Sequence, residues 1–360
     1  VTLVANDLLA NGVRDSLRDT GNAAITMAAG TSINAGTGAV TMNLRDGAGL
    51  TNSTSGNITL NDVSARTVSA INQGATAASN IVLNGTVSAT GSSGTSITLA
   101  GQKFVNNTGA SALSAGPGSR WLVWSADNTA QANNTTINGL SYDFKQFNAS
   151  YGVTPVLGSG NGLLFRQAPT IGVTLTNVAP VTKVYDGNTA VTKPLTYTMS
   201  GTLDGDTIAA LTGPVYDTKD AADNKTISFT NTLSSSNGAV TVYGYQLGTV
   251  SNADIGQITP KALTASASAP GKVYDGNTSA APTLAITGGL VGAETLTASA
   301  TGSFNSKDVL SADTVTVTGV TLADGSGLAS NYSLAAGQTA AAQITPKALT
   351  ASASAPGKVY

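Results

Sequence analysis

The chain has 360 residues, of which only 10% are charged and 41 are glycine, and its formal net charge is −2 at pH 7. It contains no cysteine and no histidine, which excludes disulfides, thiolate catalysis and most structural zinc sites. The near-neutral charge argues against a nucleic-acid partner, and no stretch has the roughly 20 apolar residues that membrane insertion requires.

The rest of the composition is dominated by Gly, Ser, Thr, Asn, Ala and Val. Ser, Thr and Asn compete with the helix for backbone hydrogen bonds, and the branched Val side chain is restricted in a helix. We therefore expect an all-β fold.

Residues 1–118 carry five short aliphatic triplets, which start at Ile25, Val40, Ile58, Ile81 and Ile97. Four of them read aliphatic, Thr, aliphatic, which is the two-residue period of a strand with one buried face. Their spacing of roughly 18 residues predicts one triplet per turn of a right-handed parallel β-helix, or solenoid. An antiparallel sandwich with long loops is the alternative.

Residues 119–170 stand out by their aromatic content and are predicted to form a cap and a linker. The last turn of a solenoid has an unpaired sheet edge that must be covered, and large rings suit that task. The alternative is a carbohydrate-binding platform, because flat rings stack on sugar faces. Its candidate residues are Trp121, Trp124, Tyr142, Phe144, Phe147 and Tyr151.

The second half of the chain is a repeat. Gln257–Tyr274 returns unchanged at Gln343–Tyr360, 86 residues later. Alternating apolar and polar runs between turn signals predict two small β-domains of sandwich or β-grasp-like type, at 171–260 and 261–346. Residues 347–360 are predicted to be the truncated start of a third repeat. Because the first residue is also not methionine, we expect this sequence to be an inner part of a longer chain.

Each repeat carries the same motif near its start. Its residues are Lys183, Tyr185, Asp186, Gly187, Asn188 and Thr189 in the first copy, and Lys272, Tyr274, Asp275, Gly276, Asn277 and Thr278 in the second. Asp-Gly is a turn signal, so we expect a turn with the tyrosine anchored on the core. A binding role for the ring, the carboxylate and the amide is the alternative.

This motif, followed by Ile-Thr-Pro-Lys, resembles the Tyr-Asp-Gly (YDG) repeat domains of very large bacterial surface proteins. The Gly-rich first part with Arg120–Ser125, Tyr142–Phe144 and Leu157–Gly162 resembles filamentous-haemagglutinin-like adhesins. The resemblance implies two-partner secretion through an outer-membrane partner in a Gram-negative bacterium. It also implies display at the cell surface and attachment to host cells, sister cells or the polysaccharide of a biofilm matrix. It implies no catalytic residue.

Other candidate sites are weak. Asp204 and Asp206 with Thr207 suggest calcium, which needs six to eight oxygen ligands, and the matching place in the second repeat has one carboxylate fewer. The acidic residues of the first part fall in turns rather than along one face, namely Asp7, Asp15, Asp19, Asp46 and Asp62. We therefore expect no metal, no cofactor and no enzyme activity.

The function expected from these observations is a stalk or spacer segment of a secreted bacterial adhesin. Two alternatives remain at this point. One is a module that binds exopolysaccharide directly, and the other is a structural extracellular filament formed by self-association.

Overall fold

The computed structural model describes every residue except 9–10, 19, 48, 127–135, 231–232 and 359–360. Its regular structure is β, apart from two short 3-10 helices among these residues, η2 (Asp15–Leu17) and η3 (Ala329–Asn331). No helix of the described part is long and apolar enough to cross a membrane.

The contacts divide the chain into two compact units. The first unit comprises Val1–Val173, Thr198–Leu211 and Asn231–Ser251, and the second comprises Thr174–Tyr197, Thr212–Thr230 and Asn252–Tyr360. The division therefore runs through the first repeat.

In the first unit, β1 to β13 form three sets of parallel strands, and successive strands of the chain belong to the three sets in turn. One sheet consists of β2 (Ala23–Thr26), β5 (Ser55–Leu60), β8 (Ile81–Leu83) and β11 (Phe104–Asn106). The next consists of β3 (Ser32–Asn34), β6 (Asp62–Ala65), β9 (Val87–Ala89) and β12 (Leu113–Ser114). The third begins with β1 (Thr2–Ala5), β4 (Ala39–Leu44), β7 (Thr67–Asn72), β10 (Gly94–Gly101) and β13 (Ser119–Ser125).

The prediction that each triplet starts a new turn, about 18 residues after the last, was wrong. Ile25 pairs with Ile58, and Ile58 pairs with Ile81, so these triplets share one sheet. The triplets that start at Val40 and Ile97 lie in a different sheet. The chain thus uses three strands before it returns to the same sheet. Strands such as β6 lack the aliphatic triplet pattern, because their buried residues include small ones, for example Ala65.

The alternation within the triplets does place one face in the core. Val40, Met42, Ile58 and Leu60 have no exposed surface, whereas Thr59 between two of them is partly exposed. Burying an aliphatic side chain of this size contributes about 1.5–3 kcal/mol.

The aromatic segment extends the third sheet. After β13 the order is β15 (Gly162–Phe165), β14 (Phe144–Gln146), β24 (Val240–Tyr243), β23 (Ser235–Asn237) and β19 (Thr207–Ile208). The strand β14 pairs with β15 on one side and with β24 of the first repeat on the other. The edge left by β13 is therefore paired by strands as well as packed by rings.

The remaining strands of the first repeat are short. They are β16 (Thr170–Leu175), β17 (Val181–Val184), β18 (Tyr197–Ser200), β20 (Pro214–Tyr216), β21 (Ala222–Lys225), β22 (Ile227–Phe229), β25 (Gln246–Ser251) and β26 (Gly256–Thr259). In the second unit, β26 pairs with β17 in parallel and with β21 in antiparallel orientation.

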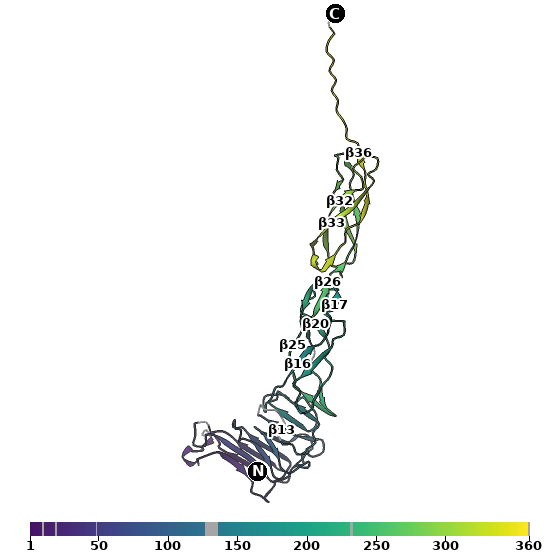
Figure 1. Cartoon of the computed structure of the whole chain (residues 1–360). Coiled ribbons are helices and arrows are strands. Elements are labelled where there is room, and N and C mark those ends of the chain that lie inside the picture. Colours follow the sequence, from purple (N-terminus) through teal and green to yellow (C-terminus); the bar gives the residue numbers. More distant parts are fainter. Residues whose placement is uncertain (9–10, 19, 48, 127–135, 231–232, 359–360) are drawn as a thin grey trace. The chain divides into compact units, whose positions relative to one another are not determined.

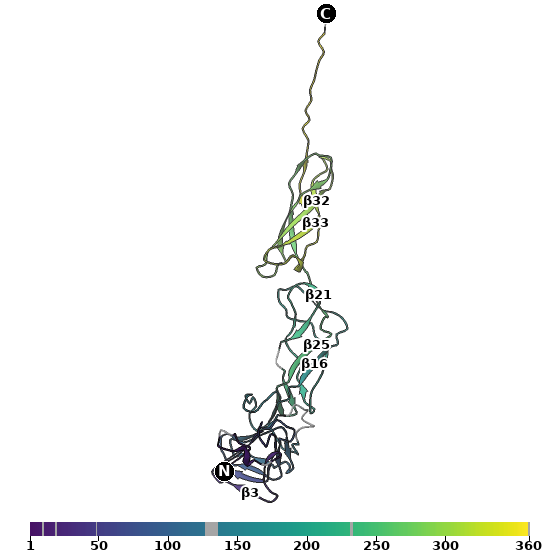
Figure 2. The same cartoon turned by 90° about the vertical axis from the view of Figure 1, so that its left-hand side faces the viewer.

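The second repeat has one main antiparallel sheet, formed by β28 (Thr264–Ser268), β31 (Thr283–Gly288), β32 (Leu296–Phe304), β33 (Thr314–Asp324) and β35 (Thr339–Ala341). The long strands β32 and β33 lie side by side in both views (Figures 1 and 2). Three short pairings complete it: β30 (Ser279–Ala280) pairs with β32, β27 (Lys261–Ala262) with β34 (Tyr332–Ser333), and β29 (Lys272–Val273) with β36 (Ile344–Thr345).

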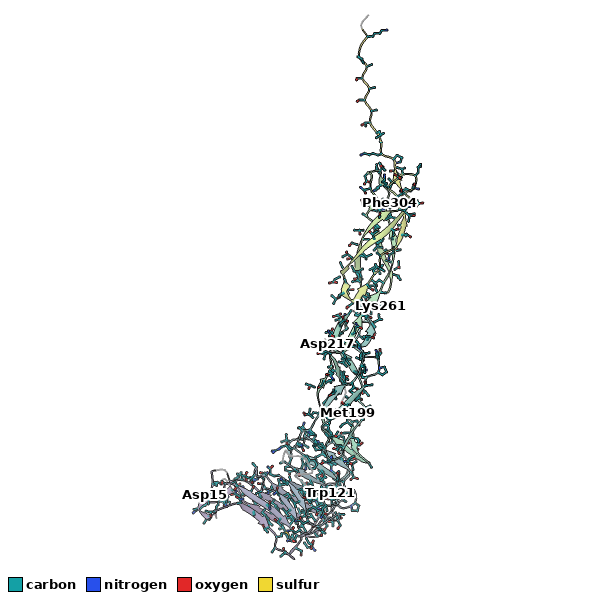
Figure 3. The ribbon with its side chains drawn as sticks, viewed as in Figure 1. Asp15, Trp121, Met199, Asp217, Lys261 and Phe304 are labelled. Atoms are coloured by element: carbon teal, nitrogen blue, oxygen red, sulfur yellow. The ribbon has the colours of Figure 1, made fainter. Side chains whose placement is uncertain are left out.

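The core of the second repeat lies toward the β36 end. It consists of Phe304, Ala312, Val315, Ala342 and Ile344, with Tyr274 packed against it. In Figure 3 the labelled Lys261 and Phe304 lie toward opposite ends of this repeat.

Candidate functional site at the domain junctions

The shared motif forms a turn that a lysine closes. In the first repeat the Lys183 ammonium lies 2.6 Å from the Asp186 carboxylate and donates to the backbone and side-chain oxygens of Asn188 at 2.7 and 3.0 Å. Gly187 has φ = +82°, a left-handed conformation that favours glycine. The motif's conformation therefore follows from its own residue types.

The second repeat builds the same turn. The Lys272 ammonium lies 2.9 Å from Asp275 and donates to the Asn277 side chain at 2.7 Å, and Gly276 again has φ = +82°. The Lys272 ammonium, aided by the Asn277 backbone N–H, holds the pKa of the Asp275 carboxyl below its ordinary value.

The tyrosine of the first motif makes its polar contact in the next repeat. Tyr185 is only 1% exposed, and its hydroxyl donates to the Glu294 carboxylate at 2.7 Å. Its ring packs edge-on against Tyr332, with 5.4 Å between the ring centroids. The Tyr332 hydroxyl donates to the other Glu294 oxygen at 2.6 Å, and Lys219 donates to the Tyr185 oxygen at 3.1 Å. We call Tyr185, Lys219, Glu294 and Tyr332 the second clasp.

A reciprocal contact lies beside the second clasp. The Asn331 amide donates to the Asp220 carboxylate at 2.8 Å, and the Ala221 backbone N–H donates to the Asn331 side-chain oxygen at 2.7 Å. Asn331 has no exposed surface, whereas the Asp220 side chain is 39% exposed. Paired bonds of this kind have strict geometry, and they define how the two repeats meet.

Burial and these bonds shift the ionisation of the clasp. The Tyr332 hydroxyl, helped by that of Tyr185, holds the pKa of the Glu294 carboxyl below its ordinary value, although burial opposes this. Burial, together with the bond to Glu294, raises the pKa of Tyr332 to about 12, and the same causes raise the pKa of Tyr185. The Asn331 amide lowers the pKa of Asp220.

An equivalent cluster lies in the first unit. The Tyr245 hydroxyl donates to Asp206 at 2.8 Å, and its ring packs on Phe147 with 5.0 Å between centroids. The Lys145 ammonium lies 2.7 Å from Asp206, and both side chains are completely buried. We call Lys145, Phe147, Asp206 and Tyr245 the first clasp. It joins the aromatic segment to the first repeat.

The two clasps use corresponding positions of the two repeats. Tyr245 and Tyr332 occupy the same place, since the backbone N–H of Leu203 donates to one at 2.8 Å and that of Val291 to the other at 3.0 Å. Each tyrosine hydroxyl donates to an acidic side chain in the loop after this N–H group, which is Asp206 in the first repeat and Glu294 in the second. In both clasps a ring and a lysine from the preceding segment approach that pair.

The carboxylates considered as calcium ligands bind a lysine instead. The Lys145 ammonium lies 3.3 Å from Asp204 and 2.7 Å from Asp206, and Asn237 also donates to Asp206 at 3.0 Å. Within the described residues, no group of three or more histidine, cysteine or acidic side chains is arranged to hold a metal ion.

Most rings of the predicted sugar platform are interior. Trp121, Phe144 and Phe147 are at most 2% exposed, so they have no face available for a sugar. Trp124 is 6% exposed and meets the 43% exposed Tyr151 edge-on, with 5.7 Å between centroids. These two rings line a cavity of about 370 Å³. Tyr142 is partly exposed and does not line that cavity.

Sequence reasoning missed the lysines and acids of the clasps as interaction partners. An alignment of the two repeats places Asp206 opposite Glu294 and Tyr245 opposite Tyr332. This correspondence could have indicated that each acid has a shared role. The sequence contains no comparable signal for Lys145, which stands among aromatic residues of the preceding segment.

The comparison with family models identifies a YDG domain at residues 169–253 and again at 259–341. Neither the curated proteins nor the solved structures include a match to this chain. Residues 169–341 thus contain two tandem copies of the YDG domain.

Proposed function

We propose that this chain is a non-catalytic stalk segment of a large secreted bacterial adhesin, in which tandem YDG domains separate the cell from a binding tip. The observation that carries the proposal is the recurrence of one clasp design at two successive junctions. A spacer needs its joints to be specific, because a freely flexible joint shortens the mean distance between its ends.

The proposal extends to the first part of the chain. We take its three parallel sheets as the end of a right-handed parallel β-helix, in which each added turn extends the stack by about 4.8 Å. Two-partner secretion, the outer-membrane partner, the Gram-negative surface and attachment to cells or biofilm matrix follow from the resemblance to filamentous-haemagglutinin-like adhesins.

An in-frame deletion in the full-length gene tests the spacer role. Removing residues 261–346 joins Pro260 to Lys347, and the seam sequence is kept because Lys347 begins an identical segment. We expect normal surface display and normal binding of soluble ligand by the tip, with reduced attachment to targets that lie deep in a surface layer. Binding of cells or matrix by the purified 360-residue chain itself would contradict a pure spacer.

One observation supports a second candidate, a carbohydrate-binding site in the first unit. The cavity beside Trp124 and Tyr151 is also lined by Asn72, Gln73 and Gln102, of which Gln73 is exposed. Rings and amides together suit a sugar, since the rings stack and the amides bond hydroxyls. A glycan array with the intact chain and with Tyr151→Ala tests it, and an array without any hit removes the candidate.

A further inference from the structure

We propose that the end of the second YDG domain formed by Tyr274, Lys307 and Asp308 is a docking surface for the acid–tyrosine face of another YDG domain. These residues correspond to Tyr185, Lys219 and Asp220, and we call each such set the turn face of its domain. Glu294, Asn331 and Tyr332 form the complementary acid–tyrosine face. The inference concerns the partner of this surface and stands independently of the adhesin role.

The motif turns of the two turn faces share a lysine contact and a glycine conformation. Lys183 and Lys272 close their turns with equivalent bonds, and Gly187 and Gly276 have the same φ of +82°. The tyrosine side chain of each motif therefore precedes a turn of the same backbone conformation. Tyr185 is 1% exposed beneath the second domain, whereas Tyr274 is only partly buried.

The glycines of the turns show which face is covered. A Cβ placed on Gly187 would lie 2.9 Å from the Val291 side chain of the second domain. A Cβ placed on Gly276 would have no atom within 4 Å. The space that the second domain occupies at the first turn face is therefore open at the second.

The charged pair of the second turn face is also more exposed. The Lys307 and Asp308 side chains are 57% and 66% exposed, compared with 43% and 39% for Lys219 and Asp220. Leu310, two residues further on, is fully exposed at 100%. A surface with a phenol, an ammonium, a carboxylate and an uncovered leucine gains most from a partner that supplies an acid, an amide and a tyrosine.

The connecting segment points to the same partner. Residues 343–358 repeat residues 257–272, which lead from the first YDG domain into the second. In that earlier copy, residues 261–272 contain β27, β28 and the first residue of β29, but residues 347–358 form no strand. The same seam would therefore present the acid–tyrosine face of a following domain to Tyr274, Lys307 and Asp308.

The test adds the partner. Residues 275–346 are appended after Tyr360, which continues the identical segment into a third complete domain. Tyr274→Phe and Lys307→Ala are then made in this extended chain and in the 360-residue chain. Thr297→Ala, an exposed position on the main sheet, is the matched control.

We expect the two turn-face substitutions to lower the thermal midpoint of the extended chain by about 4 °C or more, and that of the 360-residue chain by about 1 °C at most. The Thr297 control should leave both chains within about 1 °C. Equal effects in the two chains would overturn the proposal, because they would mean that the residues act only inside their own domain.

Cysteine cross-linking is a second readout, since the chain has no cysteine of its own. Asp220→Cys with Asn331→Cys calibrates the existing contact, in which these side chains are hydrogen-bonded at 2.8 Å. Asp308→Cys with Cys at the position of the added domain that corresponds to Asn331 then tests the new contact. A disulfide within one chain supports the proposal. Cross-links only at the calibrating pair would overturn it.

Discussion

At the scale of single residues, the two clasps share an acid and a tyrosine but differ in the groups that bind the acid. Asp206 faces the fully buried Lys145, whereas Glu294 receives two tyrosine hydroxyls. A buried ion pair is tolerated only when further bonds satisfy the charges, and Tyr245 and Asn237 supply them to Asp206.

Lys145→Ala should destabilise the first unit by about 3–5 kcal/mol, because it leaves the buried Asp206 carboxylate without its cation. Denaturant unfolding measures the loss, and the exposed Lys347→Ala serves as control. A loss below about 1 kcal/mol would contradict the importance of the Lys145–Asp206 ion pair for the stability of the first unit.

The bond between Tyr185 and Glu294 is expected to couple the two YDG domains. A double-mutant cycle of Tyr185→Phe and Glu294→Gln should give a coupling energy of about 1 kcal/mol, since a hydroxyl donates to a half-buried carboxylate. Tyr185→Phe combined with the distant Asp313→Asn should be additive within about 0.5 kcal/mol. If Tyr185→Phe and Glu294→Gln were additive, the hydrogen bond would not couple the domains, and only the contact between the Tyr185 and Tyr332 rings would remain.

At the scale of elements, the parallel sheets depend on columns of aligned apolar side chains. Ile25, Ile58, Ile81 and Phe104 pair in register across β2, β5, β8 and β11, and all are at most 8% exposed. Interiors are close-packed, so a missing side chain leaves a cavity that the rigid ladder cannot close.

Ile58→Ala should therefore cost about 2–5 kcal/mol in the free energy of unfolding of the first unit. Thr59→Ala, on the opposite and partly exposed face of the same strand, should cost less than about 1 kcal/mol. Urea unfolding followed by tryptophan fluorescence measures both, since Trp121 and Trp124 lie in this unit. Equal losses would show that the strand is not packed on one face.

At the scale of the whole molecule, pH should control the coupling between the YDG domains. The pKa values of Glu294 and Asp220 lie below their ordinary 4.5 and 3.8, so their stabilisation is present above these values and is lost as the pH falls through the lowered ones. The raised pKa values of Tyr185 and Tyr332 act in the opposite direction. Their contribution is present below the ordinary 10.0 and is lost as the pH rises through the folded values, about 12 for Tyr332.

We expect the stability difference between the chain and its Glu294→Gln variant to be constant from about pH 6 to 9 and to shrink below about pH 4. Urea midpoints of both proteins across this range measure it, and their difference removes the acid response of other groups such as Asp275. A difference that stays constant down to pH 2 would contradict the role of the ionised Glu294.

The sequence alone determined the β class, the repeat and the turn motif. These depend on local chemistry: Gly-rich and Thr-rich segments cannot form long helices, and Lys, Asp, Gly and Asn close a turn within a few residues. It also placed the apolar triplets correctly as strands with one buried face, as at Val40 and Ile58.

Only the tertiary structure decided which strands pair and what the clasps contact. The distance in sequence between paired strands was predicted wrongly, because pairing joins residues that are far apart in the chain. No local pattern indicates how many strands lie between two that pair. The identical segments 261–272 and 347–358 illustrate the same reason. The first contains β27, β28 and the first residue of β29, and the second forms no strand, because a strand needs hydrogen-bonding partners that its own sequence does not contain.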